Sequence, residues 1–204
     1  MSDDLGRLVA VLREGGVAVV PTDTVYGLAC ALDVDGAVER LYEVKGRDRG
    51  QPCQVLSYDG ERALAAVGEV DPAVEAVLRA VLPGTVTCIV ADPAGRFAAA
   101  SGTAVGSVGV RVPLMPEAFG TVEGLLVATS ANAPGGPSPS SVADVPADLI
   151  ARVDHVVDIG PLPGTASSVI DLTDLDAGVR VVRAGPDMDD LFDVLDGLGL
   201  WVRR

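Results

Sequence analysis

The stretch GGVAVVPTDTVYGLAC (residues 15–30) places a helix end, a buried strand and a hydroxyl-rich turn next to one another. Residues 17–21 are mostly β-branched, which predicts a buried strand that ends at Pro21. Residues 4–14 carry apolar side chains at helical spacing, and the two glycines that follow are expected to end that helix. Residues 22–30 are predicted to form a loop or the edge of a strand. A helix that leads directly into a buried strand is typical of proteins built from packed layers.

The same alternation of helix and strand continues along the chain. Further helices are expected at residues 36–46, 72–84, within 142–153 and at 187–199. Further strands are expected at residues 53–58, 85–91, 108–113, 125–132, 155–160, 167–173 and 179–185, the last two as a hairpin. Loops are expected at residues 92–107 and 133–141. We predict one α/β domain over residues 1–204, with a twisted mixed sheet flanked by helices.

Composition narrows the kinds of site that the chain can hold. Hydrophobic residues make up 49% of the 204 residues but aromatic residues only 3%, so the core must consist of Val, Leu, Ala and Ile. The three cysteines show no metal-binding spacing and His155 is the single histidine, which disfavours a zinc site or a histidine-based triad. We predict no bound metal. The N-terminus lacks the pattern of a signal peptide and no stretch approaches a membrane span, so we expect a cytoplasmic protein without a membrane partner.

The net charge of the chain argues against tight binding of nucleic acid. The formal net charge of −14 repels phosphate backbones at long range, although a local basic pocket remains compatible with it. A high-salt habitat would also explain this acidity, and the sequence leaves that question open. The basic residues are fourteen arginines and one lysine, Lys45. A single lysine could remain by chance, or position 45 could require a compact point charge in place of the planar guanidinium of an arginine.

Polar residues gather in four segments at the ends of the apolar strands, where ligand sites of sheet proteins tend to lie. The segments are PTDTVYGL (21–28), VKGR (44–47), VGVRVP (108–113) and TSANAPGGPSPSS (129–141). Hydroxyl groups together with separated cations suit an anionic small molecule such as a nucleotide or an amino acid. The sequence contains no P-loop, no dinucleotide-binding glycine motif and no nucleophile elbow, so a nucleotide pocket would have to be built differently.

Each segment also has a purely structural interpretation. The PTDT residues are compatible with a capped turn, and Lys45 and Arg47 with neutralisation of a helix dipole. Arg111 could lie on a solvated strand face, and residues 130–141 could form a surface loop. Residue chemistry alone therefore predicts an α/β protein with a possible anion pocket.

Six segments, in order along residues 15–186, resemble the motifs of the YrdC-like threonylcarbamoyl-adenylate synthases. The similar segments are GGVAVVPTDTVYGLAC, LYEVKGR, LPGTVTCIV, VGVRVP, ATSANAPGGPSPSS, and SSVIDLT with VVRAG. Six collinear motifs are far more specific than one short match. The length of the chain resembles that of the short, single-domain members.

The resemblance implies a fold, a reaction and partners. It implies a concave basic pocket on one face of the sheet. It also implies that L-threonine, bicarbonate (or CO2) and ATP, with Mg²⁺, form threonylcarbamoyl-AMP and pyrophosphate. A tRNA-modifying threonylcarbamoyl transferase would then use the adenylate to make N6-threonylcarbamoyladenosine in tRNA.

The resemblance also implies roles for individual residues. Those on the threonine side would be Thr22, Arg111 and Ser167. Lys45 and Arg47 would contact the phosphates and carboxylate and act in catalysis. Those that bind ATP would be Tyr26, Lys45, Arg47, Ser130, Asn132, Ser140 and Arg183. With no evident general base, catalysis would rest on positioning and charge stabilisation.

Some residues depart from the family pattern, most of them just after Arg47. The departures are Asp48, Gln51, Cys53, Gln54, Thr85, Ser140 and Ser168. They keep open an alternative function, an RNA-binding or regulatory module without synthase activity and with weak affinity for tRNA or double-stranded RNA. A relative that uses carbamoyl phosphate is a further alternative, although such enzymes usually carry extra domains.

Overall fold

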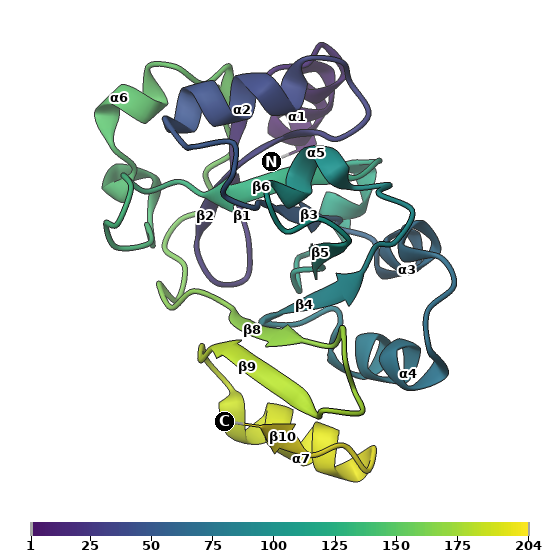
Figure 1. Ribbon diagram of the computed structural model, residues 1–204. Coiled ribbons are helices and arrows are strands. Elements are labelled where there is room, and N and C mark those ends of the chain that lie inside the picture. The colour runs from purple at the N-terminus through teal and green to yellow at the C-terminus, as the bar shows by residue number, and fades with distance from the viewer. Residues whose placement is uncertain (1, 204) are drawn as a thin grey trace.

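One mixed sheet organises the chain (Figure 1). The computed structural model describes residues 2–203, and in these residues the sheet has ten strands in the order β10-β9-β8-β4-β5-β3-β6-β2-β1-β7. The strands are β1 (Ala18–Pro21), β2 (Tyr26–Ala31), β3 (Gln54–Leu56), β4 (Val86–Ala91), β5 (Ser107–Arg111), β6 (Leu126–Ser130), β7 (His155–Val156), β8 (Ser168–Asp171), β9 (Val179–Arg183) and β10 (Val202–Arg203). Parallel and antiparallel pairs alternate irregularly, since β3 pairs parallel with β5 but antiparallel with β6. The predicted α/β class and mixed sheet are confirmed.

Helices flank this sheet on both faces. The α-helices are α1 (Ser2–Arg13), α2 (Ala37–Lys45), α3 (Gly60–Val67), α4 (Pro72–Val81), α5 (Ala98–Ser101), α6 (Ala147–Ile150) and α7 (Met188–Gly197). Two 3-10 turns are η1 (Glu117–Thr121) and η2 (Val142–Asp144). No helix in the described part of the chain is long and apolar enough to cross a membrane.

The two faces of the sheet are covered unequally. Successive side chains of a strand point to opposite faces, so each strand contributes to two layers. In β3 and β5, Val55 and Val110 join the larger core, into which α2, α3, α4 and α7 also pack. The smaller core on the opposite face is built around α1 and η1 and reaches only as far as Leu56 on β3. In the described residues the smaller core does not extend over β4, β5 and β8, and this part of the second face borders a cavity.

The predicted secondary structure differs from the structure in several places. Residues 92–107 were expected to form a loop, but they contain the helix α5 and the first residue of β5. Residues 22–30 were expected as a loop or strand edge, but β2 is a fully buried strand between β1 and β6. No helix is expected from the sequence between residues 58 and 72, where Asp59–Gly60 is a typical turn signal. Asp59 is instead the N-cap of α3, and its carboxylate accepts a hydrogen bond from the Arg62 N–H at 3.1 Å. The hairpin of β8 and β9 is confirmed.

Candidate active site

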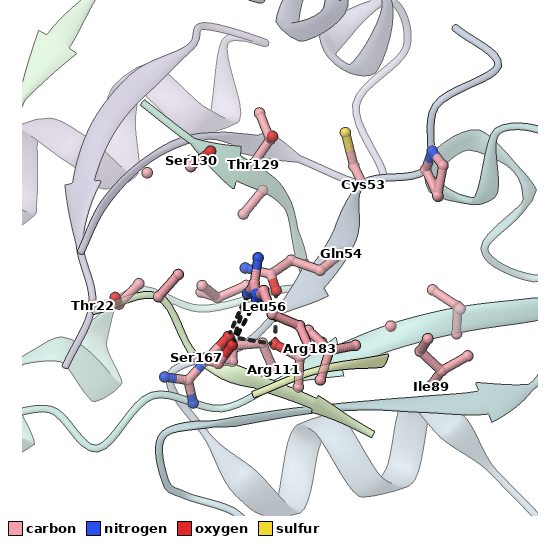
Figure 2. Close-up of a pocket in the computed structure, with 18 of the residues that line it drawn as sticks. Thr22, Cys53, Gln54, Leu56, Ile89, Arg111, Thr129, Ser130, Ser167 and Arg183 are labelled. Atoms are coloured by element: carbon pink, nitrogen blue, oxygen red, sulfur yellow. Dashed lines mark hydrogen bonds between the residues drawn. The ribbon is translucent and has the colours of Figure 1, made fainter. Parts of the chain in front are cut away.

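A cavity of about 300 Å³ lies on the uncovered face of the sheet (Figure 2). Its volume is at the lower end of the range of small-molecule sites. Its walls contain three arginines and many hydroxyl groups, and among the described residues no Asp, Glu or His lines it. The polar lining residues are Thr22, Thr24, Arg47, Gln54, Thr87, Ser101, Ser107, Arg111, Thr129, Ser130, Ser138, Ser167 and Arg183.

Figure 2 shows two groups of polar residues on opposite sides of this cavity. Thr129 and Ser130, at the end of β6, lie on one side, and Ser167, Arg111 and Arg183 lie on the other. The strand order explains this separation, because β5, β4, β8 and β9 follow one another on one side of β3 while β6 lies on its other side.

The turn between β1 and β2 forms one edge of the cavity. The Thr22 hydroxyl accepts hydrogen bonds from the Thr24 N–H at 3.2 Å and the Val25 N–H at 3.1 Å, and donates to the Val25 carbonyl at 2.7 Å. The PTDT segment is thus the capped turn of the structural interpretation, yet Thr22 also lines the cavity. The structural and the functional interpretation of this segment are therefore compatible.

Arg111, at the end of β5, is buried and paired. Only 1% of its side chain is exposed, so the proposal of a solvated strand face is wrong. Its Nη2 donates to the Asp23 carboxylate and its Nη1 to the Val86 and Val112 carbonyls, each at 3.3 Å. Burial raises the pKa of the Asp23 carboxyl and lowers the pKa of the Arg111 guanidinium, and the attraction between the two groups opposes both shifts.

Arg47 reaches the cavity from the end of α2. Gly46 takes the left-handed conformation (φ 62°) that ends the helix and turns the chain toward the sheet. The Arg47 Nη1 donates to the Thr129 hydroxyl at 3.2 Å and Nη2 to the Pro52 carbonyl at 2.8 Å. Its Nε is buried and has no hydrogen-bond partner among the described residues.

Lys45, the last residue of α2, lies two positions before Arg47 and is buried. Its ammonium donates to the Ser130 carbonyl at 2.6 Å, to the Asn132 side-chain oxygen at 2.8 Å and to the Asn132 carbonyl. Burial and then the nearby Arg47 cation lower the pKa of Lys45 to about 8. The lone lysine therefore ties α2 to the segment after β6, and it is not among the residues that line the cavity.

Three other residues expected on the nucleotide side also point elsewhere. The Tyr26 hydroxyl donates to the Gly160 carbonyl at 2.7 Å and accepts from the Ile159 N–H at 3.0 Å. The Asn132 amide donates to the Gly136 carbonyl at 2.6 Å, and the Ser140 hydroxyl donates to Asp144 at 3.0 Å. Of the site residues expected from the sequence, the cavity lining brings together Thr22, Arg47, Arg111, Ser130, Ser167 and Arg183.

Three residues of the site carried no role in the expectations from the sequence. Asp23 is the partner of Arg111, and Thr87 and Gln54 join the cavity floor. A signal for Thr87 and Gln54 existed, because each is a polar residue at an alternating position of an otherwise apolar strand. Asp23 gave no comparable signal, since an aspartate in a turn is ordinary.

Comparison with known proteins gives consistent matches. A family model, Sua5_yciO_yrdC, described as "Telomere recombination", matches residues 10–185. A putative threonylcarbamoyl-AMP synthase of Mycobacterium tuberculosis is 33% identical over 87% of this chain and 82% of its own length. The threonylcarbamoyl-AMP synthase of Bacillus subtilis is 31% identical over 83% of this chain. The structure of P. abyssi Sua5 complexed with L-threonine superposes with a TM-score of 0.86 at 26% identity and covers 100% of this chain.

The matches extend over most of this chain but not always over most of the relative. The alignment spans 50% of the Bacillus subtilis protein, and the superposition covers 60% of the P. abyssi protein. This chain therefore matches about half to three fifths of the length of those two proteins.

Proposed function

This chain belongs to the Sua5/YciO/YrdC family, and we propose that it is a threonylcarbamoyl-AMP synthase. The substrates are L-threonine, bicarbonate (or CO2) and ATP, and the products are threonylcarbamoyl-AMP and pyrophosphate. One observation supports the proposal most directly: the cavity is lined by three arginines and many hydroxyl groups, without an acidic residue among the described ones. Such a lining suits substrates that carry carboxylate and phosphate groups.

The proposed reaction has two bond-forming steps. The threonine amine attacks the carbon of CO2 and releases a proton, or attacks the carbon of bicarbonate with loss of water, and either route gives a carbamate. A carbamate oxygen then attacks the α-phosphorus of ATP, and the bond from that phosphorus to the pyrophosphate oxygen breaks. Both steps join anionic or neutral groups, so holding the reactants together and neutralising their charge lowers the barrier.

The residues of the site divide between these tasks by their place in the cavity. Arg47, Thr129 and Ser130 lie on the side we assign to ATP, where the positive charge of the Arg47 guanidinium suits the phosphates. Ser167 and Arg183 lie together on the opposite side, which we assign to threonine, whereas the family resemblance implies that Arg183 binds ATP. We assign Lys45 a positioning role, because its ammonium binds the Ser130 carbonyl and the Asn132 side chain at the end of β6. No His, Asp or Glu in the described lining is placed to serve as a general base.

The residues present do not fit a metal ion held by the protein. The described residues contain no group of three or more His, Cys, Asp or Glu side chains that could hold one. Mg²⁺ would then enter as part of the Mg-ATP substrate.

The product has a defined chemical fate. A mixed anhydride of a carbamate and a phosphate is an activated acyl donor, so a transferase must take the threonylcarbamoyl group, and we propose tRNA as its acceptor in the cytoplasm. The net charge of −14 predicts at most weak, salt-dependent binding of tRNA by this chain itself.

A pyrophosphate assay tests the proposal. Purified protein with L-threonine, bicarbonate and Mg-ATP should release pyrophosphate and form threonylcarbamoyl-AMP, detectable by mass spectrometry, at low or at high salt. Omission of threonine should stop both. Pyrophosphate release that does not depend on threonine contradicts the proposal. Activity only with carbamoyl phosphate would indicate the related carbamoyl chemistry, and tRNA binding without any turnover would indicate the RNA-binding alternative.

A further inference from the structure

Gln54 has a side chain that crosses a neighbouring strand on the cavity floor. It is the first residue of β3, and its register partner on β5 is Gly109. A side chain at Gly109 would place its Cβ 3.7 Å from the Gln54 Cβ and 3.2 Å from the Thr87 Cγ2. Because Gly109 has none, the Gln54 amide reaches over β5 to Thr87 on β4, where its Oε1 accepts a hydrogen bond from the Thr87 hydroxyl at 3.0 Å. Figure 2 shows Gln54 within the cavity.

The orientation of this amide follows from a chain of hydrogen bonds that starts at an arginine. The Arg183 Nη2 can only donate, and it donates to the Ser167 hydroxyl at 3.3 Å. Ser167 and Thr87 share a hydrogen bond of 3.0 Å. Since Thr87 gives its single proton to Gln54, Ser167 must be the donor in that bond.

The reversed orientation of the amide leaves a group without a partner. If Nε2 faced Thr87, the Thr87 hydroxyl would accept from it, and Thr87 and Ser167 would each have only the other hydroxyl as an acceptor. Because these two hydroxyls share one hydrogen bond, one of their two protons would have no acceptor among the described residues. When Oε1 faces Thr87, the hydroxyl protons of both Ser167 and Thr87 have acceptors. We therefore infer that the Gln54 Nε2 faces away from Thr87.

Nε2 is consequently a donor without a protein partner at the cavity floor. Neither of its hydrogens reaches an acceptor within residues 2–203, and the atom is not sealed from the cavity. Its surroundings combine positive charge and apolar surface. Arg111 lies two residues beyond Gly109 on the same face of β5, and Ile89 opposes Gly109 from β4. Such a floor fits a small molecule with one anionic group and a short aliphatic part.

We propose that Gln54 is a specificity-determining residue, which donates from Nε2 to a carboxylate oxygen of the amino-acid substrate. This inference rests on the proposed synthase function. A carboxylate accepts from amide N–H groups and is attracted by the nearby guanidinium groups. The polyphosphate of ATP fits this spot less well, because the floor beside Gln54 is formed in part by the apolar residues Leu56, Ile89 and Val169. The relay from Arg183 acts as the positioning device, since it fixes which face of the amide meets the ligand.

Calorimetric titration of L-threonine in the absence of ATP tests this proposal. Gln54→Leu should weaken binding about ten- to hundredfold, as expected for loss of a hydrogen bond to a charged group. Gln54→Glu keeps the size and the bond from Thr87 but turns an acceptor toward the carboxylate, and it should weaken binding further. Gln51→Leu is the matched control, because Gln51 is an exposed glutamine three residues away that does not line the cavity, and its affinity should equal that of the wild type.

L-threoninol, which has an alcohol in place of the carboxylate, identifies the ligand group. The Gln54→Leu change should reduce affinity for L-threonine far more than affinity for L-threoninol, and affinity for a non-hydrolysable ATP analogue should stay within twofold. Equal losses for threonine and threoninol, a loss only for the ATP analogue, or unchanged threonine affinity in a folded Gln54→Leu protein each overturn the proposal while the synthase function stands. Absence of threonine binding by the wild type overturns the proposed function, and this inference with it.

Discussion

The guanidinium of Arg111 is paired with the carboxylate of Asp23, and only 1% and 10% of these side chains are exposed. The pair joins the end of β5 to the turn between β1 and β2, two segments separated by 88 positions in the sequence. The other Asp23 oxygen accepts from the Leu114 N–H at 2.8 Å. Arg111 thus holds the PTDT turn at the edge of the cavity as well as contributing its charge to the lining.

Asp23→Asn should destabilise the protein strongly. The substitution leaves the Arg111 cation buried without a counter-charge, which costs about 3 kcal/mol of unfolding free energy or more. Urea denaturation followed by circular dichroism measures this loss. Asp148→Asn is the control, because Asp148 pairs with Arg152 on the surface with 73% of its side chain exposed. That surface substitution should change stability by less than about 1 kcal/mol. Equal effects of the two substitutions would show that the buried pair has no special role.

Lys45 should give the protein a recognisable dependence of stability on alkaline pH. Its pKa is lowered to about 8, so between pH 8 and the ordinary lysine pKa the unfolded chain binds more protons than the folded one. Stability must rise with pH in that window, by at most about 1.4 kcal/mol per pH unit. The difference in unfolding free energy between the wild type and Lys45→Met isolates this contribution, because all other titrations cancel.

The difference should be independent of pH below about pH 7 and should grow in favour of the wild type from pH 8 to pH 10. A difference that stays constant up to pH 10 would mean that Lys45 keeps an ordinary pKa. The same variant should be less stable than the wild type even at pH 7, since it leaves the Ser130 and Asn132 oxygens without their donor.

Tyr26→Phe should affect stability rather than nucleotide binding. The hydroxyl holds residues 158–160, because it accepts a hydrogen bond from the Ile159 N–H at 3.0 Å and donates its one proton either to the Gly160 carbonyl at 2.7 Å or to the Asp158 carboxylate at 3.1 Å. Loss of these bonds should cost about 1–3 kcal/mol because buried partners are left unsatisfied. Thermal unfolding and the KM for ATP are the two measurements. A raised KM for ATP at unchanged stability would place Tyr26 in the nucleotide site, as the family resemblance implies.

The layers of this fold follow from the sequence because their residues repeat the same local pattern. Short apolar strands and amphipathic helices alternate, and each predicts its own conformation. Local propensity did not predict β2, because its sequence YGLACA contains no β-branched residue. It forms a buried strand because β1 and β6 lie on either side of it. The start of α3 was not predicted because an Asp–Gly pair occurs both in turns and at helix N-caps. The hydrogen bond from the Arg62 N–H to the Asp59 side chain shows that it is an N-cap here.

The arrangement of side chains in the site could be predicted from the sequence less well than the fold. The family resemblance identified the arginines and Ser167, but the state of each side chain depends on partners that are distant in sequence. Arg111 is buried because Asp23 neutralises it, and Lys45 is withdrawn from the cavity because carbonyls after β6 bind it. Gln54 became part of the floor because Gly109 is small. No local pattern contains such pairings, since they arise only when the strands assemble.

Arg47→Gln should impair the use of ATP with little effect on threonine. Arg47 lines the cavity on the side assigned to ATP. Its guanidinium can donate charge-assisted hydrogen bonds to a phosphate oxygen of the substrate. Loss of one charge-assisted hydrogen bond in the transition state should lower kcat/KM for ATP about a hundredfold. Steady-state pyrophosphate release at varied ATP and saturating threonine measures this loss.

Arg49→Gln provides the matched control, because Arg49 is an arginine two residues away with 61% of its side chain exposed and an ion pair to Glu39 on the surface. It should retain kcat/KM within about twofold, since exposed pairs contribute little. Calorimetric binding of L-threonine without ATP should be unchanged in both variants. If Arg47→Gln instead weakened threonine binding and left the KM for ATP unchanged, Arg47 would belong to the amino-acid side of the cavity, and the two sides assigned here would have to be exchanged.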